Sequence, residues 1–382
     1  MLSDLDRLMR ERAIDTVIVP MHEAMHASFR WLSRGAKITR GYAVKLLDRA
    51  PILVTYPMER EEALATGLEV HLAHEYSSSP DDYEELYANM LHALGASESI
   101  AFFGNVPIQL YLGIADSLAR RGWRVHRSNG EDLIQLARKR KEPWEVDAIR
   151  SVGARTELVV DGVRALLREA ERGRSMTLGD LKAFVSQEIA RLGMIEDHET
   201  ILSQGRDAGV PHSRGEASAQ LRLSVPLVID IFPADKSSGY FFDLTRTFCI
   251  GPIPDELARV HGQVLEAFTR ARNAMRPGTL ASSYHALVCD FFESLGYSTQ
   301  RSNPKSFEGY VHGLGHGVGL DIHEKPSFSL TQSDAIEEGD VLTIEPGLYF
   351  PDREIGVRIE DTFVVTRDGV ESLCRGDYGL AP

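Results

Sequence analysis

The feature that most limits how this chain can fold is a set of acidic residues placed inside apolar, β-rich segments of its second half. Asp230 ends the run SVPLVID, Asp243 lies in YFFDLTRTF, Glu345 in VLTIEPGLYF and Glu360 in GVRIEDTFVV. A carboxylate in a buried strand loses its hydration, and an unpaired one is costly. A fold for this chain must therefore give these carboxylates a shared partner.

Asp230 and Asp243 are the most informative pair, because the turn-rich run PADKSSG joins their strands and predicts a hairpin. In such a hairpin we expect both side chains on one face. Two facing aspartates repel each other and lose hydration unless a cation lies between them. A lone aspartate in a strand needs no such explanation, so it is the pair that indicates a cation site.

Three histidines, His312, His316 and His323, lie in the glycine-rich run YVHGLGHGVGLDIHEKP. Glycines allow sharp bends and a close approach of the backbone to a ligand. The candidate metal ligands are the four carboxylates and one of these histidines: Asp230, Asp243, His316, Glu345 and Glu360. This set suits two ions such as Mn²⁺, Co²⁺, Fe²⁺ or Zn²⁺, and two ions about 3.5 to 4 Å apart can share and acidify a water.

The cysteines argue against a thiolate zinc site and against a disulfide framework. Cys249, Cys289 and Cys374 are odd in number, far apart and without CxxC spacing. We expect them to be buried free thiols.

The charge balance and the N-terminal sequence limit the partners. The chain carries 42 Lys and Arg against 56 Asp and Glu, a formal net charge of −14, which repels phosphate backbones and anionic lipid. Its first residues, MLSDLDRLMRERAIDTVIVP, place acids and arginines where a signal peptide needs an apolar stretch, and no apolar run approaches ~18 residues. We therefore expect a cytoplasmic protein that acts on small molecules or peptides, with no nucleic-acid or membrane partner.

The 382 residues are enough for two domains. In residues 1–138, β-rich runs alternate with amphipathic stretches such as Ile108–Arg120, which predicts a layered α/β domain. The expected strands are Asp15–Val19, Ile52–Tyr56, Val70–Ala73, Ile100–Phe103 and Trp123–His126. No chemical motif occurs in this part, so a scaffold or specificity role suits it.

A charge-dense run, ARKRKEPWEVDAIR, marks the boundary to a second domain over residues 139–382. Pro143 suits the first position of a long helix, whose apolar residues recur at three- and four-residue steps over about 25 residues. Further on, GRSMTLGDLKAFVSQEIARLGM and PGTLASSYHALVCDFFESLGYS are similar to each other. This repeat predicts two related halves about a pseudo-twofold axis, each supplying helices to one side of a curved sheet. Two amphipathic helices can also look alike by chance.

The second domain resembles the pita-bread metallopeptidase superfamily, whose members include methionine aminopeptidase, aminopeptidase P, prolidase and creatinase. The order Asp, Asp, His, Glu, Glu and the segments DLTRTF, HGLGH, DIHE, IEPGLYF and VRIED carry the resemblance, which runs from Pro143 to the C-terminus. The first domain is similar to the creatinase-type N-terminal domain. The resemblance implies an α/β N-terminal domain followed by an α+β pita-bread catalytic domain, with pseudo-twofold halves and a curved antiparallel sheet.

The resemblance also implies roles for the candidate ligands. Asp230 would bind one metal ion, Asp243 and Glu360 would bridge both, and His316 would bind the other. Glu345 would complete the set and act as the general base.

Four further residues match positions near the family's substrate. His212 would line the substrate pocket, His323 would contact the scissile amide or the tetrahedral intermediate, and His312 matches a histidine of the proline-specific branch. Arg358 would either orient the bridging carboxylate as its ion-pair partner, which we favour, or contact the substrate.

By resemblance, the chain is a dinuclear metallopeptidase that hydrolyses Xaa-Pro bonds through a metal-bridged hydroxide, as an Xaa-Pro aminopeptidase or an Xaa-Pro dipeptidase. We expect Mn²⁺ first, with Co²⁺, Zn²⁺ or Fe²⁺ as alternatives, a short peptide substrate with proline at its second position, and a homodimer or higher homo-oligomer. Methionine aminopeptidase is disfavoured because it lacks a comparable N-terminal domain and the HGLGH histidine pair.

Two alternatives come from other classes. One is a non-peptidase pita-bread hydrolase or lyase that acts on a small metabolite, which fold alone does not exclude. The other is an inactive protein-binding module, which the retention of all five ligand residues disfavours, as it does a metal-free creatinase reaction. One departure from the family bears on specificity: Asp230 and Asp243 are 13 residues apart, two more than usual, so we expect the longer PADKSSG loop to alter the pocket rim.

Overall fold

The computed structural model describes residues 2–22, 24–79, 82–126 and 132–382. The chain forms two compact units, of which the first ends at Arg138 and the second runs from Lys139 to Pro382.

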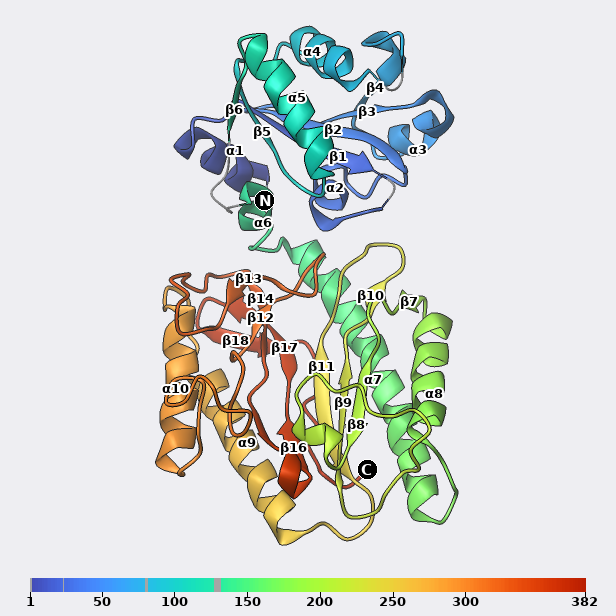
Figure 1. Cartoon of the computed structure of the whole chain (residues 1–382), viewed down its shortest axis with the longest axis vertical. Helices are drawn as coiled ribbons and strands as arrows, with labels where there is room; N and C mark the ends of the chain where they lie inside the picture. Colours follow the sequence, from blue (N-terminus) through green and yellow to red (C-terminus); the bar gives the residue numbers. More distant parts are fainter. Residues whose placement is uncertain (1, 23, 80–81, 127–131) are drawn as a thin grey trace. The chain divides into compact units, whose positions relative to one another are not determined.

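The N-terminal unit is built on one six-stranded mixed sheet (Figure 1) with strand order β4-β3-β2-β1-β5-β6. Its helices and strands are α1 (Leu2–Glu11), β1 (Thr16–His22), α2 (Ala27–Leu32), β2 (Arg40–Leu46), β3 (Ile52–Thr55), α3 (Arg60–Leu64), β4 (Glu69–Leu72), α4 (Tyr83–Ala93), β5 (Ser99–Phe102), α5 (Ile108–Arg120), β6 (Arg124–His126) and α6 (Leu133–Ala137). β2 pairs antiparallel with β1 and β3, whereas the other three strand pairs are parallel.

Both faces of this sheet are covered by helices. Side chains alternate along a strand, so Val17 and Val19 of β1 enter one core with α1, α2 and α6, while Ile18 enters a second core with α4 and α5. The layered α/β prediction is confirmed. The five expected strands correspond to β1, β3, β4, β5 and β6, and α5 has the expected bounds.

The remaining strand, β2, was not predicted from the sequence. Its run RGYAVKL contains Lys45, whose side chain is buried in the unit. The ammonium pairs with Asp6 and donates to the carbonyl oxygen of Leu46 at 2.8 Å. A buried lysine needs such partners, and nothing in the strand pattern reveals them.

The C-terminal unit contains four long helices and several antiparallel sheets. Its helices and strands are α7 (Pro143–Glu171), α8 (Leu178–Arg191), β7 (Met194–Ile195), β8 (Ile201–Gln204), β9 (Pro226–Ile231), β10 (Ala234–Asp235), β11 (Leu244–Cys249), α9 (Asp255–Ala274), α10 (Ala281–Ser294), β12 (His316–Gly317), β13 (Glu324–Ser327), β14 (Val341–Ile344), β15 (Gly347–Phe350), β16 (Ile355–Arg358), β17 (Asp361–Thr366) and β18 (Gly369–Ser372). Every pair among strands β7 to β18 is antiparallel.

The unit has two halves of similar design. Each half begins with a helix pair, α7 with α8 and α9 with α10, and continues into strands. In Figure 1 the two pairs lie on opposite sides of the strands. The strands form a three-stranded sheet β11-β9-β8 and a five-stranded sheet β13-β12-β14-β17-β18, and a bridge between Thr245 and Glu360 joins them. The pita-bread architecture is confirmed.

Helix α7 begins at Pro143, as predicted, and buries one face along its length. A Cβ atom on Gly153 would lie 2.5 Å from the ring of Phe242, so glycine allows that ring to pack against the helix. Phe242 is fully buried and is followed directly by Asp243. This packing therefore helps to hold a candidate metal ligand.

α7 spans 29 residues but carries charged side chains along its exposed face. Among the helices of the described part of the chain, none is both long enough and apolar enough to cross a membrane.

Candidate metal centre

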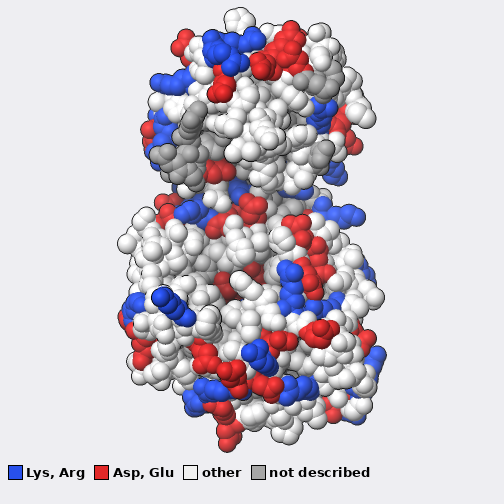
Figure 2. Space-filling view, in the orientation of Figure 1, with Lys and Arg blue, Asp and Glu red and all other residues white. Residues whose placement is uncertain are grey.

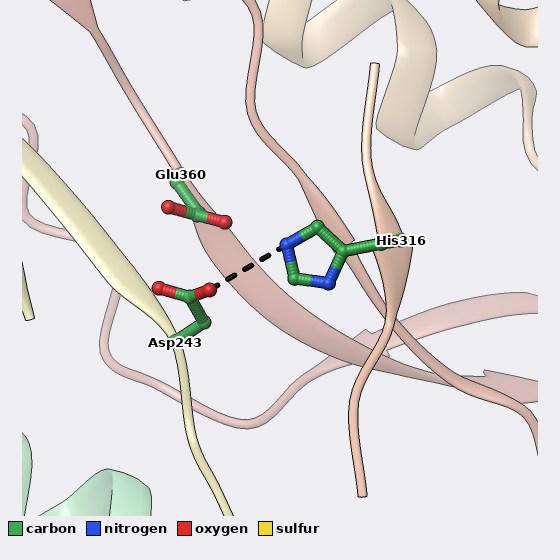
Figure 3. A group of neighbouring side chains, drawn as sticks. All are labelled: Asp243, His316 and Glu360. Carbon is green, nitrogen blue, oxygen red and sulfur yellow. Dashed lines mark ion pairs between the residues drawn. The ribbon is translucent and has the colours of Figure 1, made fainter. Parts of the chain in front are cut away.

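Three candidate ligands converge at the beginnings of separate strands of the C-terminal unit: Asp243 directly before β11, His316 in β12 and Glu360 directly before β17. One potential ligand atom from each of Asp243, His316 and Glu360 lies within 4.8 Å of the others. Figure 3 shows the three side chains pointing toward one another. Nε2 of His316 is 3.5 Å from Oδ2 of Asp243 and 3.6 Å from Oε1 of Glu345. The fold thus gathers residues that are far apart in sequence around one point.

Asp230 joins this group through the register of β9 and β11. The strands pair antiparallel as expected, with Asp230 opposite Thr245 and Ile231 opposite Leu244. Continued by one residue, the register sets Asp243 opposite residue 232. Residues two apart on a strand share a face, so Asp230 and Asp243 lie on the same face.

The carboxylates have unused oxygen atoms in the protein interior. Within the described residues, Oδ1 of Asp230, Oδ1 of Asp243 and Oε1 of Glu360 are buried and have no hydrogen-bond partner. Buried polar atoms are nearly always paired, and a group of unpaired ones calls for an explanation such as an ion. Oxygen donors beside one imidazole are ligands suited to divalent cations, so the residues present fit a metal centre.

Burial and mutual repulsion raise the pKa values of these carboxyl groups. Loss of hydration, then repulsion from the neighbouring carboxylates, holds the pKa of Asp243 and of Glu360 well above the usual range. Burial raises the pKa of Glu345 to about 8, although Arg358 opposes the shift. Without a cation, the site therefore favours protonated carboxyl groups.

His316 is held in the form that binds a metal. Burial lowers its pKa to about 3, so the ring is neutral at ordinary pH. Nδ1 lies 3.1 Å from the carbonyl oxygen of Gly317 and must donate to it, because a carbonyl only accepts. Nε2 is then the unprotonated nitrogen and is turned toward the carboxylates.

Gly317, next to His316, lets two strands come close together. A Cβ atom on Gly317 would lie 2.1 Å from the carbonyl oxygen of Lys325 on β13. Glycine is required here because the neighbouring strand comes so close.

Arg358 makes its ion pair with Asp230 and not with the expected bridging carboxylate. Its Nη2 donates to Oδ2 of Asp230 at 2.6 Å, and the guanidinium is buried. Its link to Glu360 is indirect: Nε donates to the hydroxyl of Thr245 at 3.2 Å, which donates to Oε2 of Glu360 at 2.7 Å. Arg358 therefore orients Asp230, because Thr245 occupies the place beside Glu360.

His312 has protein partners at both ring nitrogens. Nδ1 donates to the carbonyl oxygen of Gly313 at 2.7 Å, and Nε2 lies 2.8 Å from the hydroxyl of Tyr349. That hydroxyl also accepts from Arg358 at 3.0 Å, so it donates to His312. Burial lowers the pKa of His312 to about 3. Sequence reasoning missed Tyr349, and an aromatic residue in an apolar strand offered no signal.

The centre opens into a pocket of about 570 Å³. His212 and His323 both line it with exposed side chains, and the rings of His316 and His323 are 4.3 Å apart. In Figure 2 this face of the C-terminal unit is hollowed near its middle, where acidic side chains are visible. The remaining lining includes residues that sequence reasoning did not select: His198, Glu199, Arg214, Phe232 and Gln300.

The longer loop after Asp230 does not form the rim as expected. None of residues 233–239 lines the pocket. β10, within this loop, pairs instead with β7. The carboxylate of Asp235 pairs with Arg155 at 2.8 Å and accepts from the backbone N–H groups of Ser237 and Ser238. These contacts hold the loop beside β7 and away from the pocket.

The cysteines take no part in the centre. All three are free, with Cys249 and Cys289 buried as expected and Cys374 partly exposed.

A pita-bread fold that gathers buried carboxylates and a neutral imidazole beside a pocket defines the class of the protein, a metallopeptidase. The chain belongs to metallopeptidase family M24, whose sequence pattern matches residues 147–367. Enzymes of this family work with divalent metal ions.

Individual relatives agree with this membership. The probable dipeptidase PepE of Mycobacterium tuberculosis is 32% identical over 73% of this chain and 68% of that protein. The Xaa-Pro dipeptidase of Pyrococcus furiosus is 26% identical over 99% of both chains. Among solved structures, an X-Pro aminopeptidase from Thermotoga maritima superposes with a TM-score of 0.81 over 98% of this chain and 99% of that one, at 23% identity.

Proposed function

We propose that this metallopeptidase is a dinuclear enzyme that hydrolyses Xaa-Pro bonds. The observation that carries the proposal is the set of unpaired, buried oxygen atoms on Asp230, Asp243 and Glu360 beside the unprotonated Nε2 of His316. A relative similar along nearly the full chain is named an Xaa-Pro dipeptidase, which supports the same substrate class.

Each ligand residue has one role in this proposal. Asp230 would hold one ion and His316 the second, Asp243 and Glu360 would be shared by both ions, and Glu345 would complete the set. When bound, the two divalent ions supply an acidified water and polarise the scissile carbonyl. Mn²⁺ is the ion we propose first, with Co²⁺, Zn²⁺ and Fe²⁺ as alternatives.

Glu345 is the proposed general base. It accepts a proton from the attacking water and passes it to the leaving nitrogen. Its place beside Nε2 of His316 puts it at the centre itself.

His323 and His212 are the proposed substrate contacts, since both are exposed in the pocket wall. His323 stabilises the charge that develops on the scissile group, while His212 borders the bound peptide. His312, with both nitrogens engaged by the protein, shapes the pocket wall together with Tyr349. Arg358 holds Asp230 in place.

Proline at the second position is the proposed specificity. An Xaa-Pro bond is a tertiary amide with no N–H to donate. A site that recognises it therefore relies on shape and on contacts to the scissile carbonyl and the proline ring. Exposed imidazoles beside a metal-anchored carbonyl, with Phe232 and Phe328 also in the pocket lining, offer such contacts.

The test is a comparison of kcat/KM for Ala-Pro, Ala-Pro-Ala and Ala-Ala-Ala with Mn²⁺-loaded, Co²⁺-loaded and Zn²⁺-loaded protein. We expect kcat/KM to be higher for both proline substrates than for Ala-Ala-Ala. The comparison of Ala-Pro with Ala-Pro-Ala distinguishes a dipeptidase from an aminopeptidase. Equal values for all three peptides would contradict the proline specificity and leave the metal centre standing. No hydrolysis by any loaded form would contradict the proposed activity itself.

A further inference from the structure

Asp361 follows Glu360 directly and is fully buried, yet no part of the proposed chemistry uses it. Neighbouring residues on a strand point to opposite faces, so Asp361 is turned away from the metal centre. Both of its carboxylate oxygens are engaged: Oδ1 accepts from Nη2 of Arg246 at 2.7 Å, and Oδ2 accepts from the hydroxyl of Tyr378.

Arg246 donates hydrogen bonds to the backbone of both sheets at the point where they meet. Its Nη1 donates to the carbonyl oxygen of Glu360 at 2.7 Å and to that of Thr245 at 2.9 Å. Its Nε donates to the carbonyl oxygen of Asp377 at 2.7 Å. One buried guanidinium thus ties the backbone of a candidate bridging ligand to β11, the strand that Asp243 precedes directly.

Tyr378 reaches this point because its segment is attached to the rest of the unit on either side. Asp377 pairs with Arg164 of α7, and the carbonyl oxygen of Leu380 accepts from the backbone N–H of Cys249 at 2.8 Å. The guanidinium of Arg246 also lies 4.8 Å from the centre of the Tyr378 ring. The segment near residue 378 is therefore packed against the back of the metal centre.

We infer that Arg246, Asp361 and Tyr378 form a clamp, here named the Glu360 clamp, that positions the Glu360 carboxylate and thereby sets the affinity of the metal centre. The inference rests on the dinuclear centre of the proposed function. One backbone bridge, between Thr245 and Glu360, joins β11 to the start of β17 at this point, and the hydroxyl of Thr362 also bonds to the backbone of Asp243. The hydrogen bonds of Asp361 to Arg246 and Tyr378 resist rotation of the strand, so Glu360 keeps its place beside Asp243.

A purely structural ion pair would also be buried and well bonded, so the test must separate metal affinity from stability. Substitution of a residue that supports a metal ligand through hydrogen bonds typically weakens metal affinity by 10- to 100-fold. A structural pair changes the unfolding temperature of the metal-free protein and leaves the affinity of the folded protein unaltered.

The key variant is Tyr378→Phe, which removes one hydroxyl and keeps the ring beside Arg246. Its matched control is Tyr297→Phe, because the Tyr297 hydroxyl donates to Gln263 on α9 at 2.7 Å and contacts no candidate ligand. Titration calorimetry with Mn²⁺ alone measures the affinity of each metal-free protein. We expect roughly a tenfold weaker affinity in Tyr378→Phe, at the lower end of that range, and a wild-type affinity in Tyr297→Phe.

Asp361→Asn is the second variant, since it removes the charge while keeping the shape, and we expect a larger loss of Mn²⁺ affinity. A wild-type affinity in Tyr378→Phe, with only its unfolding temperature lowered, would overturn the inference and leave the proposed function intact. Equal losses in Tyr378→Phe and Tyr297→Phe would overturn it as well. If the wild-type protein binds none of Mn²⁺, Co²⁺, Zn²⁺ and Fe²⁺, the dinuclear centre fails and the inference falls with it.

Discussion

Arg358 donates to Oδ2 of Asp230 at 2.6 Å, while Oδ1 of the same carboxylate is buried without a partner in the described residues. One oxygen is thus neutralised by a fixed cation, and the other remains available. Four carboxylates gather here, those of Asp230, Asp243, Glu345 and Glu360, against one buried guanidinium. Four negative charges less one positive charge leave an excess of three, which divalent cations can balance.

Asp243→Asn tests the ligand set. The amide keeps the shape of the side chain but donates poorly to a metal, so we expect metal content to fall from about two ions per chain to about one or fewer. Elemental analysis of the purified proteins measures this. Asp147→Asn, an exposed position on α7, is the matched control and should keep its metal. Full activity in protein proven to be metal-free would contradict the prediction.

The metal-free protein should lose stability as pH rises from about 7 to about 8, above the range in which the buried, neutral His312 and His316 gain stability with rising pH. The pKa of Glu345 lies at 4.5 in the unfolded chain and is raised to about 8 in the fold, and those of Asp243 and Glu360 are also raised. In this window the folded state binds more protons than the unfolded state, so the free energy of unfolding falls with rising pH. Thermal unfolding across this range measures the effect.

Metal binding should release protons for the same reason, because a cation displaces them from the raised carboxyl groups. Calorimetry with Mn²⁺ in buffers of different ionisation enthalpy counts the protons, and the affinity should rise with pH. Glu345→Gln is the control, since it removes one titrating group and should reduce the number released. An affinity that is independent of pH between about 5 and 8 would refute this coupling.

Glu345→Gln should lower kcat by on the order of 10² or more, the usual scale for loss of a positioned general base. Glu345 is also a candidate ligand, so metal content must be measured in the same preparation. Glu338→Gln, at an exposed position, serves as the control and should leave kcat unchanged. A variant that retains its metal and its wild-type kcat would remove Glu345 from the role of base.

His323→Ala should keep both ions bound and lower kcat more than it raises KM, because the imidazole is proposed to stabilise the intermediate. Steady-state kinetics with a proline dipeptide, together with metal analysis, measure both effects. Loss of metal from His323→Ala would show that the residue has another role.

His312→Ala should act on stability, in contrast to the exposed His323. Removing this half-buried ring deletes its hydrogen bonds to the Tyr349 hydroxyl and the Gly313 carbonyl, each of which contributes about 0.5 to 1.5 kcal/mol. Chemical denaturation of the two metal-free variants compares their free energies of unfolding. Equal stability of His312→Ala and wild type would contradict the observed hydrogen bonds.

Much of the architecture was predictable because its signals are local. The apolar periodicity that begins at Pro143 predicted α7, and alternating runs predicted most of the N-terminal sheet. β2 was missed because it contains the buried Lys45, whose ammonium pairs with Asp6, a contact that no local pattern reveals. The altered-rim prediction failed for a similar reason, since the pairing of β10 with β7 decides where the loop lies.

The sequence by itself determined the chemistry that the candidate site can offer. Carboxylates inside apolar strands have to be compensated wherever they fold, so the positions of Asp230, Asp243, Glu345 and Glu360 in the chain are enough to indicate a cation site. Their order, with His316 among them, also carried the resemblance to the metallopeptidase family.

Only the tertiary structure decided which side chains hold those carboxylates in place. Arg358 stands two residues from Glu360 in the sequence but pairs with Asp230, and Arg246 reaches Asp361 across 115 residues of chain. A buried hydrogen bond or ion pair forms between groups that packing brings within about 3 Å. That proximity depends on strand register and on how the two sheets meet, so the sequence near either partner cannot specify it.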